Sequence, residues 1–313
     1  MAHSLVIRAS APGTLMLLGE HAVLHGARAL VLAVDKRIRV RLTPQPGTGV
    51  VIDSALGRYE GDLGLLEDDP RFRFVLAAIG LVKERLPSGF TLSIDSDFSH
   101  QVGLGSSAAV TVAVLAALNY WLGQQGDTQL LFAQSRQAML EVQGRGSGAD
   151  LAAAIEGGLV AYHQSGARQR FDQLPEIGLY YSGYKVKTPV VLQRVAEARE
   201  CLPQLYDELY QLMGQCAEQA CAAAQSGDWP QLGRLMNLYQ GLMDALGVND
   251  AKLSEMVYSL RRCERVLGAK ISGSGLGDCV ISLGLSDSAL GFEAIPVGVS
   301  QRGVEVCVDG DCA

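Results

Sequence analysis

The chain has 313 residues, of which 48% are hydrophobic and 19% charged, and its formal net charge is −7. At roughly 150 residues per domain this length predicts two domains, or one large one, with enough apolar residues for a buried core. The composition is typical of ordered globular proteins. The acidic balance argues against a surface that neutralises nucleic-acid phosphates or lies on an anionic membrane.

Two further features bear on location. The start of the chain, Met1-Ala-His-Ser-Leu, lacks the basic region and the apolar segment of a signal peptide. The most apolar helical stretch, residues 108–122, is shorter than the roughly 20 residues that a membrane span needs. We therefore expect a cytoplasmic protein with no nucleic-acid partner and no membrane partner.

Cysteines and histidines give little support for a metal or disulfide framework. The seven cysteines include no Cys-x-x-Cys pair, so reduced thiols are expected, with a bridge between Cys307 and Cys312 as the alternative. His21 and His25 are four residues apart, as in helical zinc motifs. However, Glu20 precedes both histidines instead of lying between them, which disfavours zinc.

The first half of the chain is predicted to combine strands and helices. Residues 5–9 and 15–19 are expected to form two strands around the turn residues 11–13. Residues 29–42 end with apolar side chains at every second position, which is typical of a half-buried antiparallel strand. Companion strands are predicted over residues 50–52, 90–94 and 157–162, and helices over residues 72–86, 106–122, 128–142 and 151–155.

A polar stretch over residues 163–173 interrupts the apolar pattern. We place a domain boundary there, with an N-terminal domain over residues 1–165 and a C-terminal domain over residues 166–313. The second domain is predicted to begin with a strand over residues 178–182 and to close with further strands. Its predicted helices span residues 190–198, 202–225, 229–246 and 252–266.

Three segments, residues 103–105, 144–148 and 273–277, carry glycine at every second position. Glycine lets the backbone approach a ligand and aim successive N–H groups at an anion, and the start of a following helix adds further donors. Tight turns between packed elements are the alternative. Three such segments, two of which open predicted helices, favour a polyphosphate ligand.

The common nucleotide-binding motifs do not account for these segments. No Gly-x-x-x-x-Gly-Lys-Ser/Thr motif occurs, which excludes a Walker loop. Residues 103–108, Gly-Leu-Gly-Ser-Ser-Ala, match a permissive dinucleotide fingerprint between a predicted strand and a predicted helix. The chain before them is predicted to be antiparallel and not βαβ, so dinucleotide binding is the less favoured alternative.

Four segments together resemble the GHMP family of small-molecule kinases. They read APGTLMLLGEHAVLHG over residues 11–26, GLGSSAA over 103–109, GRGSGAD over 144–150 and AKISGSGLGDCVI over 269–281. They follow the order of the family along nearly the whole chain, and within the family they are most similar to kinases that act on mevalonate. The resemblance implies an α+β fold of two domains, the first similar to ribosomal protein S5 domain 2 and the second ferredoxin-like.

The same resemblance implies an ATP-dependent phosphotransferase that uses Mg²⁺ and phosphorylates the primary hydroxyl of mevalonate to 5-phosphomevalonate in isoprenoid precursor synthesis. A homodimer is compatible with it. By position in the motifs, Asp150 would be the catalytic base, although any Asp there could instead cap the following helix. The nucleotide would be bound by Gly103, Leu104, Gly105, Ser106, Ser107, Ala108, Gly273 and Gly275.

The remaining implied roles concern the metal and the acceptor. Ser107 and Glu141 would hold magnesium, although Glu141 could equally be a solvated helix residue. Glu20, His21, Lys185 and Thr188 would contact the acceptor. The alternatives are a core histidine for His21 and an exposed charge for Lys185.

The sequence departs from the family pattern at four positions, one of which is Gln101, where a glycine normally precedes the second segment. Thr14 stands where the motif normally has lysine, and we hypothesise that Lys185 or Arg145 supplies the missing charge. Leu276 and Asp278 replace glycines in the last segment. A carboxylate facing phosphates would repel them unless magnesium intervenes or the side chain points away.

Two other functions stay open. Residues 143–150 are also similar to phosphomevalonate kinases, although an acceptor that already carries phosphate should need several cations in its pocket. The second alternative is a catalytically inactive, kinase-like sensor of a small molecule. Thr14 and Asp278 favour the sensor, whereas Asp150, Ser106 and Ser107 argue for phosphoryl transfer.

Overall fold

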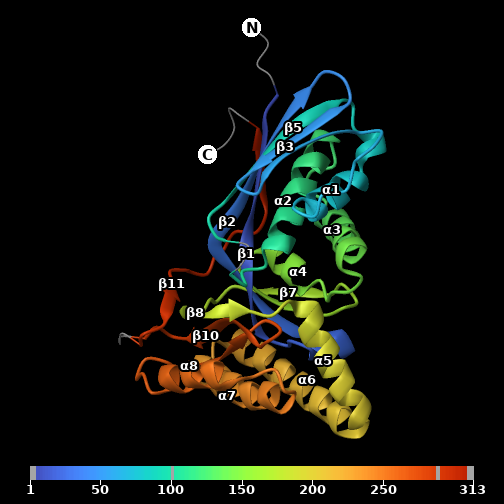
Figure 1. The fold of residues 1–313 in the computed structure, drawn as a ribbon. Coiled ribbons are helices and arrows are strands. Elements are labelled where there is room, and N and C mark those ends of the chain that lie inside the picture. Colours follow the sequence, from blue (N-terminus) through green and yellow to red (C-terminus); the bar gives the residue numbers. More distant parts are fainter. Residues whose placement is uncertain (1–4, 100–101, 287–289, 309–313) are drawn as a thin grey trace.

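The computed structural model describes residues 5–99, 102–286 and 290–308, and within them two β-sheets lie one beyond the other, each covered by helices (Figure 1). The first sheet has the strand order β12-β1-β2-β5-β3-β4, and β6 and β7 extend it from β2. Its strands are β1 (Ile7–Leu18), β2 (Ala29–Gln45), β3 (Gly49–Ser54), β4 (Gly57–Asp62), β5 (Gly89–Ser96), β6 (Leu159–Tyr162), β7 (Arg168–Phe171) and β12 (Glu305–Val308).

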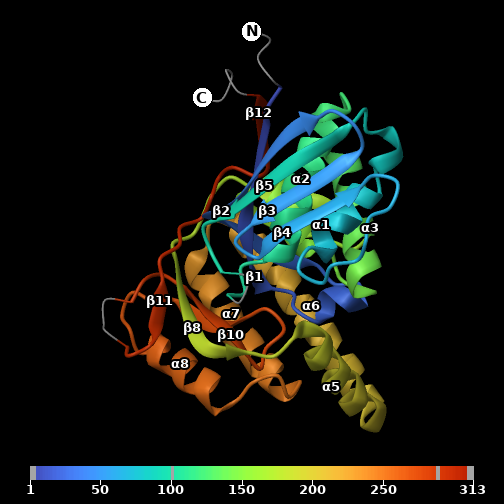
Figure 2. The same cartoon turned by 45° about the horizontal axis from the view of Figure 1, so that its top comes forward.

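Helices α1 to α4 cover one face of this sheet (Figure 2). Helix α2 lies against β1 and β2 on one side and against α1, α3 and α4 on the other, which explains why its sequence is apolar almost all round. The helices are α1 (Arg73–Gly80), α2 (Ser106–Trp121), α3 (Thr128–Gln143) and α4 (Ala149–Glu156), with short 3₁₀ turns η1 (Ala22–His25) and η2 (Lys83–Arg85).

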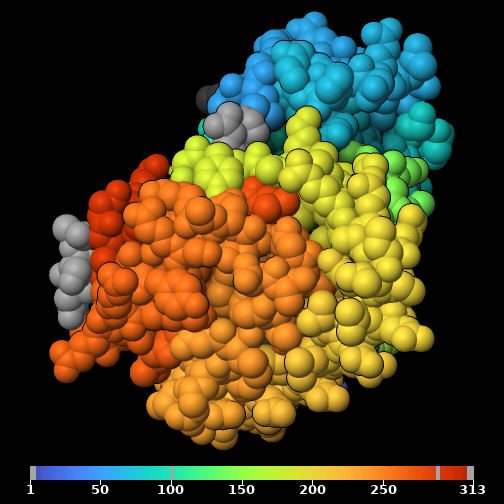
Figure 3. All heavy atoms as spheres, turned by 60° about the horizontal axis from the view of Figure 1, so that its bottom comes forward, coloured from blue at the N-terminus to red at the C-terminus, as the bar shows by residue number. Residues whose placement is uncertain are grey.

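The second sheet has the strand order β11-β8-β10-β9, with antiparallel pairing throughout. Its strands are β8 (Ile177–Lys185), β9 (Gly268–Ser272), β10 (Gly277–Leu283) and β11 (Glu293–Ile295). The helices that follow β8 are α5 (Thr188–Cys201), α6 (Pro203–Ser226), α7 (Trp229–Ala245) and α8 (Ala251–Arg261). Helices α7 and α8 pack on β9, and Figure 3 shows residues of this helical half, in yellow and orange, as one continuous face.

The sequence predicted most of these elements, including all helices of the second half, but it was wrong about the first strands. Residues 7–18 form one continuous strand, β1, and not two strands around a turn. Pro12 cannot donate to the ladder, and the register with β2 shifts between Pro12 and Thr14. The irregularity absorbs the turn-forming residues without ending the strand.

The predicted boundary near residue 165 falls between β6 and β7. This boundary stays a prediction. Strands β7 and β12 follow it in sequence and belong to the first sheet, so the chain returns to that sheet after the boundary. Cys307 in β12 is disulfide-bonded, so the expectation of reduced thiols is wrong there, and Cys312 lies outside the described residues. No helix in the described part of the chain is long and apolar enough to cross a bilayer.

Candidate active site

The three glycine-rich segments come together where the two sheets meet. The backbone N–H of Gly103 donates to Asp278 Oδ1 at 2.6 Å, which joins the first segment to the third. A Cβ atom placed on Gly105 would lie 3.5 Å from Asp150 Oδ1, which brings the second segment to the first. Segments 40 residues or more apart in sequence therefore form one site, as the polyphosphate interpretation requires.

The first segment leads directly into α2. Gly105 caps this helix in the left-handed conformation, with φ 62°, and a Cβ at this position would come within 2.0 Å of Thr14 Oγ1. Ser106 and Ser107 form the first turn, where the N–H groups have no partner within the helix. The loop therefore places glycine backbone and free helix donors side by side, an arrangement suited to anions.

Asp150 lies in the first turn of α4. The cap of this helix is Gly148, so the alternative role of Asp150 as the N-cap is wrong. Its Oδ1 accepts a hydrogen bond from Thr14 Oγ1 at 2.7 Å. Burial raises the pKa of the Asp150 carboxyl above its ordinary 3.8, while the Thr14 hydrogen bond opposes that rise. A raised pKa brings a carboxylate closer to what a general base needs at neutral pH.

Thr14 is buried, and its neutral hydroxyl occupies the position beside Asp150. Of the two cations considered as substitutes for the family lysine, Lys185 lies close enough to lower the pKa of Asp150 by attraction, and it pairs with Asp278 Oδ2 at 2.8 Å. Arg145 instead donates to the carbonyl oxygen of Pro189 at 2.7 Å on an exposed surface. The geometry favours Lys185 over Arg145.

Glu20 is buried in an ion pair that sequence reasoning missed. Lys270 Nζ lies 2.5 Å from Glu20 Oε1, both side chains are at most 3% exposed, and the Lys270 ammonium also donates to the carbonyl oxygen of Ile271. Tyr239 donates its hydroxyl to the Glu20 carbonyl oxygen at 2.7 Å. Burial lowers the pKa of Lys270, and the nearby Glu20 carboxylate opposes that shift.

A signal for Lys270 was present in the sequence, because the lysine interrupts an apolar run just before the last glycine-rich segment. A charged residue in a buried strand needs a buried partner. The sequence did not show which acidic residue that partner would be.

His21 and Thr188 both contact Ser274 in the last glycine-rich segment. His21 Nε2 lies 2.9 Å from the Ser274 carbonyl oxygen, so the ring donates from Nε2, and Ser274 Oγ lies 3.4 Å from Thr188 Oγ1. Burial lowers the pKa of His21 below its ordinary 6.5, which keeps the ring neutral. Two of the four residues that were expected to contact the substrate thus lie beside the same loop, residues 273–277.

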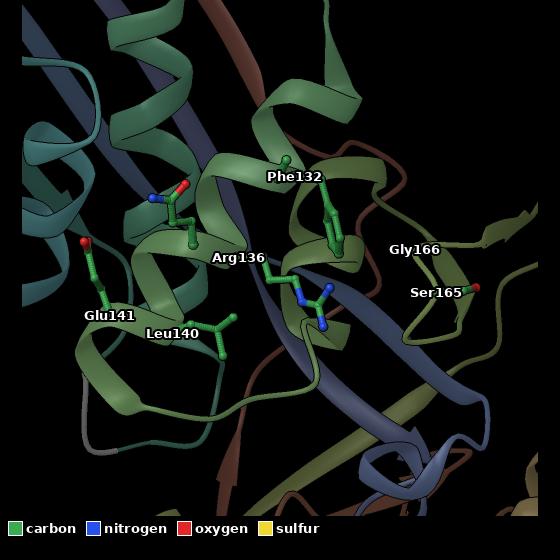
Figure 4. A pocket seen from close by; sticks show the side chains of 8 residues that line it. Phe132, Arg136, Leu140, Glu141, Ser165 and Gly166 are labelled. Atoms are coloured by element: carbon green, nitrogen blue, oxygen red, sulfur yellow. The ribbon is translucent and has the colours of Figure 1, made fainter.

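Glu141, the second expected magnesium ligand, is exposed near the end of α3 and has no hydrogen bond or ion pair with Ser107 or Asp150. It borders a hollow on the outer side of α3, where Arg136 extends toward the turn of Ser165 and Gly166 while Glu141 points away from that turn (Figure 4).

In the described ranges, no three His, Cys, Asp or Glu side chains are arranged to hold a metal. Magnesium bound to a nucleotide needs only one or two protein oxygens, because phosphates and water complete its shell. The Ser107 hydroxyl in the first turn of α2 is a donor of that kind, whereas Glu141, which borders the hollow on α3, does not fit that role.

Similarity to known proteins identifies the family of this chain. The sequence model described as the GHMP kinases N terminal domain matches residues 73–158, and that described as GHMP kinases C terminal matches residues 217–291. Mevalonate kinase of Thermococcus onnurineus is 34% identical over 88% of this chain and 89% of its own length. The chain therefore belongs to the GHMP kinase family of small-molecule kinases.

Solved structures lead to the same family and confirm the predicted two-domain α+β fold. The crystal structure of L. major mevalonate kinase in complex with R-mevalonate has a TM-score of 0.74 and 27% identity, and the match covers 89% of this chain and 87% of that one. Streptococcus pneumoniae phosphomevalonate kinase, in complex with phosphomevalonate and AMPPNP, has a TM-score of 0.77 and 20% identity, covering 93% and 99% of the two chains. The second likeness concerns the fold alone.

Proposed function

We propose that this chain is a mevalonate kinase, which transfers the γ-phosphoryl group of ATP to the primary hydroxyl of mevalonate. The observation that carries the chemistry is the Asp150 carboxylate, held by Thr14 beside the glycine loop at the start of α2. The choice of mevalonate as acceptor is supported by the relatives at 30–34% identity, which are named mevalonate kinase.

Asp150 is the general base in this mechanism. It takes the proton from the acceptor hydroxyl while that oxygen forms a bond to the γ-phosphorus, and the bond from phosphorus to the bridging oxygen of ADP breaks. The backbone of Gly103 and Gly105 and the first turn of α2 bind the phosphates. Ser107 would hold Mg²⁺ together with the phosphates, and Mg²⁺, when bound, would neutralise charge on them.

Lys185 supplies the positive charge that Thr14 cannot. Its ammonium lies at the edge of the glycine loop and acts electrostatically on Asp150. A cation there stabilises the charge that spreads over the transferred phosphoryl group. Arg145, the other cation considered for this role, is bound to the carbonyl oxygen of Pro189.

His21 and Thr188 position the acceptor through the loop that carries Ser274. Glu20 acts one step further away, because its carboxylate is buried against Lys270 and hydrogen-bonded by the Gly273 N–H at 3.4 Å. Glu20 therefore fixes the last glycine-rich segment, where Gly273 and Gly275 would meet the nucleotide.

The test is ADP release from MgATP with mevalonate, phosphomevalonate, galactose or homoserine as acceptor, with Asp150→Asn as the matched control. Release with mevalonate that falls by about 10²- to 10⁴-fold in the control supports both the acceptor and the base. ADP release with phosphomevalonate alone would show that phosphomevalonate is the acceptor and would leave the proposed mechanism unchanged. ATP binding without turnover on any acceptor would favour a sensor.

A further inference from the structure

Asp278 places a carboxylate on the loop that would bind the phosphates of ATP. Its Oδ1 accepts from the Gly103 N–H at 2.6 Å, and its Oδ2 lies 2.8 Å from Lys185 Nζ. The side chain is only 16% exposed. The Asp278 carboxylate thus has two donors, a backbone N–H and an ammonium group. Phosphate oxygens bind to donors of the same kinds.

The carboxylate lies directly over the Gly103 backbone. A Cβ atom at Gly103 would meet the three carboxylate atoms of Asp278 at 2.2 to 2.4 Å. While Asp278 occupies this position, a phosphate oxygen cannot approach the same N–H group. The first N–H groups of α2, by contrast, have no partner within the helix.

The backbone shows that Asp278 is held in an unfavourable conformation. Its φ is 70°, in the left-handed region that side chains other than glycine rarely adopt, and Leu276 before it has φ 55°. Asp tolerates this conformation better than most residues, yet it costs energy that the contacts with Gly103 and Lys185 must offset. A ligand that takes over those two donors would remove the contacts that hold the side chain there.

We propose that Asp278 is an internal competitor for one phosphate position and thereby sets the affinity for the nucleotide. In the free protein its carboxylate occupies the Gly103 N–H and keeps the Lys185 ammonium beside the loop. When the nucleotide binds, both donors exchange the carboxylate for a phosphate oxygen. The inference rests on the proposed function, because it takes residues 103–107 as the phosphate-binding loop.

The experiment measures the Kd of MgATP, and of ADP with EDTA, by isothermal titration calorimetry at fixed ionic strength. Asp278→Asn removes the charge and keeps the shape, while Asp278→Gly removes the side chain and suits the left-handed backbone. Glu293→Gln is the matched control, because Glu293 is an exposed acid on β11, which β8 separates from the strand β10 that carries Asp278. Thermal unfolding verifies that each variant is folded.

We expect both Asp278 variants to bind both ligands about fivefold tighter, the size of one partly exposed charge interaction, while Glu293→Gln stays near the parent protein. The gain should shrink at high salt. Unchanged or weaker binding of both ligands would overturn the proposal. Weaker binding of MgATP alone would also overturn it, since the carboxylate would then act as a metal ligand.

Failure of the proposed function has a different signature. A parent protein that binds MgATP but phosphorylates no acceptor would contradict the kinase assignment and leave the affinity change at Asp278 intact. A parent protein and two variants that bind neither ligand would overturn both proposals.

Discussion

Two acid–lysine pairs flank the last glycine-rich segment, and they differ chiefly in burial. Glu20 and Lys270 lie at the N-terminal end of the segment, and their side chains are 3% and 0% exposed. Lys185 and Asp278 close its other end and are 34% and 16% exposed. The chemistry is the same, but a buried pair cannot exchange its partner for water, whereas a partly exposed pair can.

The difference assigns the two pairs to different tasks. The buried pair has further contacts on both partners, because the Gly273 N–H donates to Glu20 Oε1 and the Lys270 ammonium donates to the carbonyl oxygen of Ile271, so it fixes the segment in place. The more exposed pair contacts the Gly103 N–H of the proposed phosphate-binding loop, and in our proposal it releases its lysine to a ligand. One end of the segment is therefore anchored, and the other is available for chemistry.

Breaking the buried pair should have the largest effect on stability. Lys270→Met leaves the Glu20 carboxylate buried without its charge partner, which costs about 3–5 kcal/mol of unfolding free energy. Urea unfolding measures the loss. The double variant Glu20→Gln with Lys270→Met should recover part of it, because no unpaired charge stays buried. A Lys270→Met protein as stable as its parent would remove the distinction between the two pairs.

The same substitution at the exposed pair should leave stability almost unchanged and lower activity. Lys185→Met is expected to change the unfolding free energy by less than about 1 kcal/mol. The loss of a cation facing the transferred group should lower kcat by about 10²-fold. Arg145→Ala, which removes a cation bound to Pro189, is the control and should have a much smaller effect on turnover. Full turnover in Lys185→Met would contradict the assigned role.

Sequence patterns predicted the glycine-rich segments and the helices, because these depend on local rules such as periodicity, capping and backbone freedom. The role of Asp150 came from the resemblance to the family and stays a prediction. The patterns did not predict which charged side chains would pair with one another. Lys270 pairs with Glu20, 250 residues away in sequence. Lys185 pairs with Asp278 because the register of β8 with β10 brings the two residues together. Such partners are set by the packing of distant elements. The continuous strand β1 was missed for a related reason, since pairing with β2 overrides the local turn signal.

Lowering the pH tests the buried end of the segment through His21, which contacts Ser274. Its pKa is lowered from 6.5 in the folded protein, so below pH 6.5 the unfolded chain binds more protons than the folded one. The contribution of His21 to the free energy of unfolding is therefore complete above pH 6.5. It declines as the pH falls below that value, by at most about 1.4 kcal/mol per pH unit for one group. Unfolding free energies at pH 7 and 5.5 should show a smaller decline in His21→Gln than in the parent. Equal declines would show that His21 is not the group responsible.

The smallest effect is expected at the neutral link between Thr14 and Asp150. The Thr14 hydrogen bond lowers the pKa of Asp150 against the dominant effect of burial, so Thr14→Val should raise that pKa further. A base works only when deprotonated, and activity is lost as the pH falls through its pKa. The acid limb of the kcat/KM profile should therefore move to higher pH, by about one unit or less. Thr14→Ser, which keeps the hydroxyl, is the matched control and should leave the limb in place. A limb that moves to lower pH in Thr14→Val would mean that a group other than Asp150 is the base.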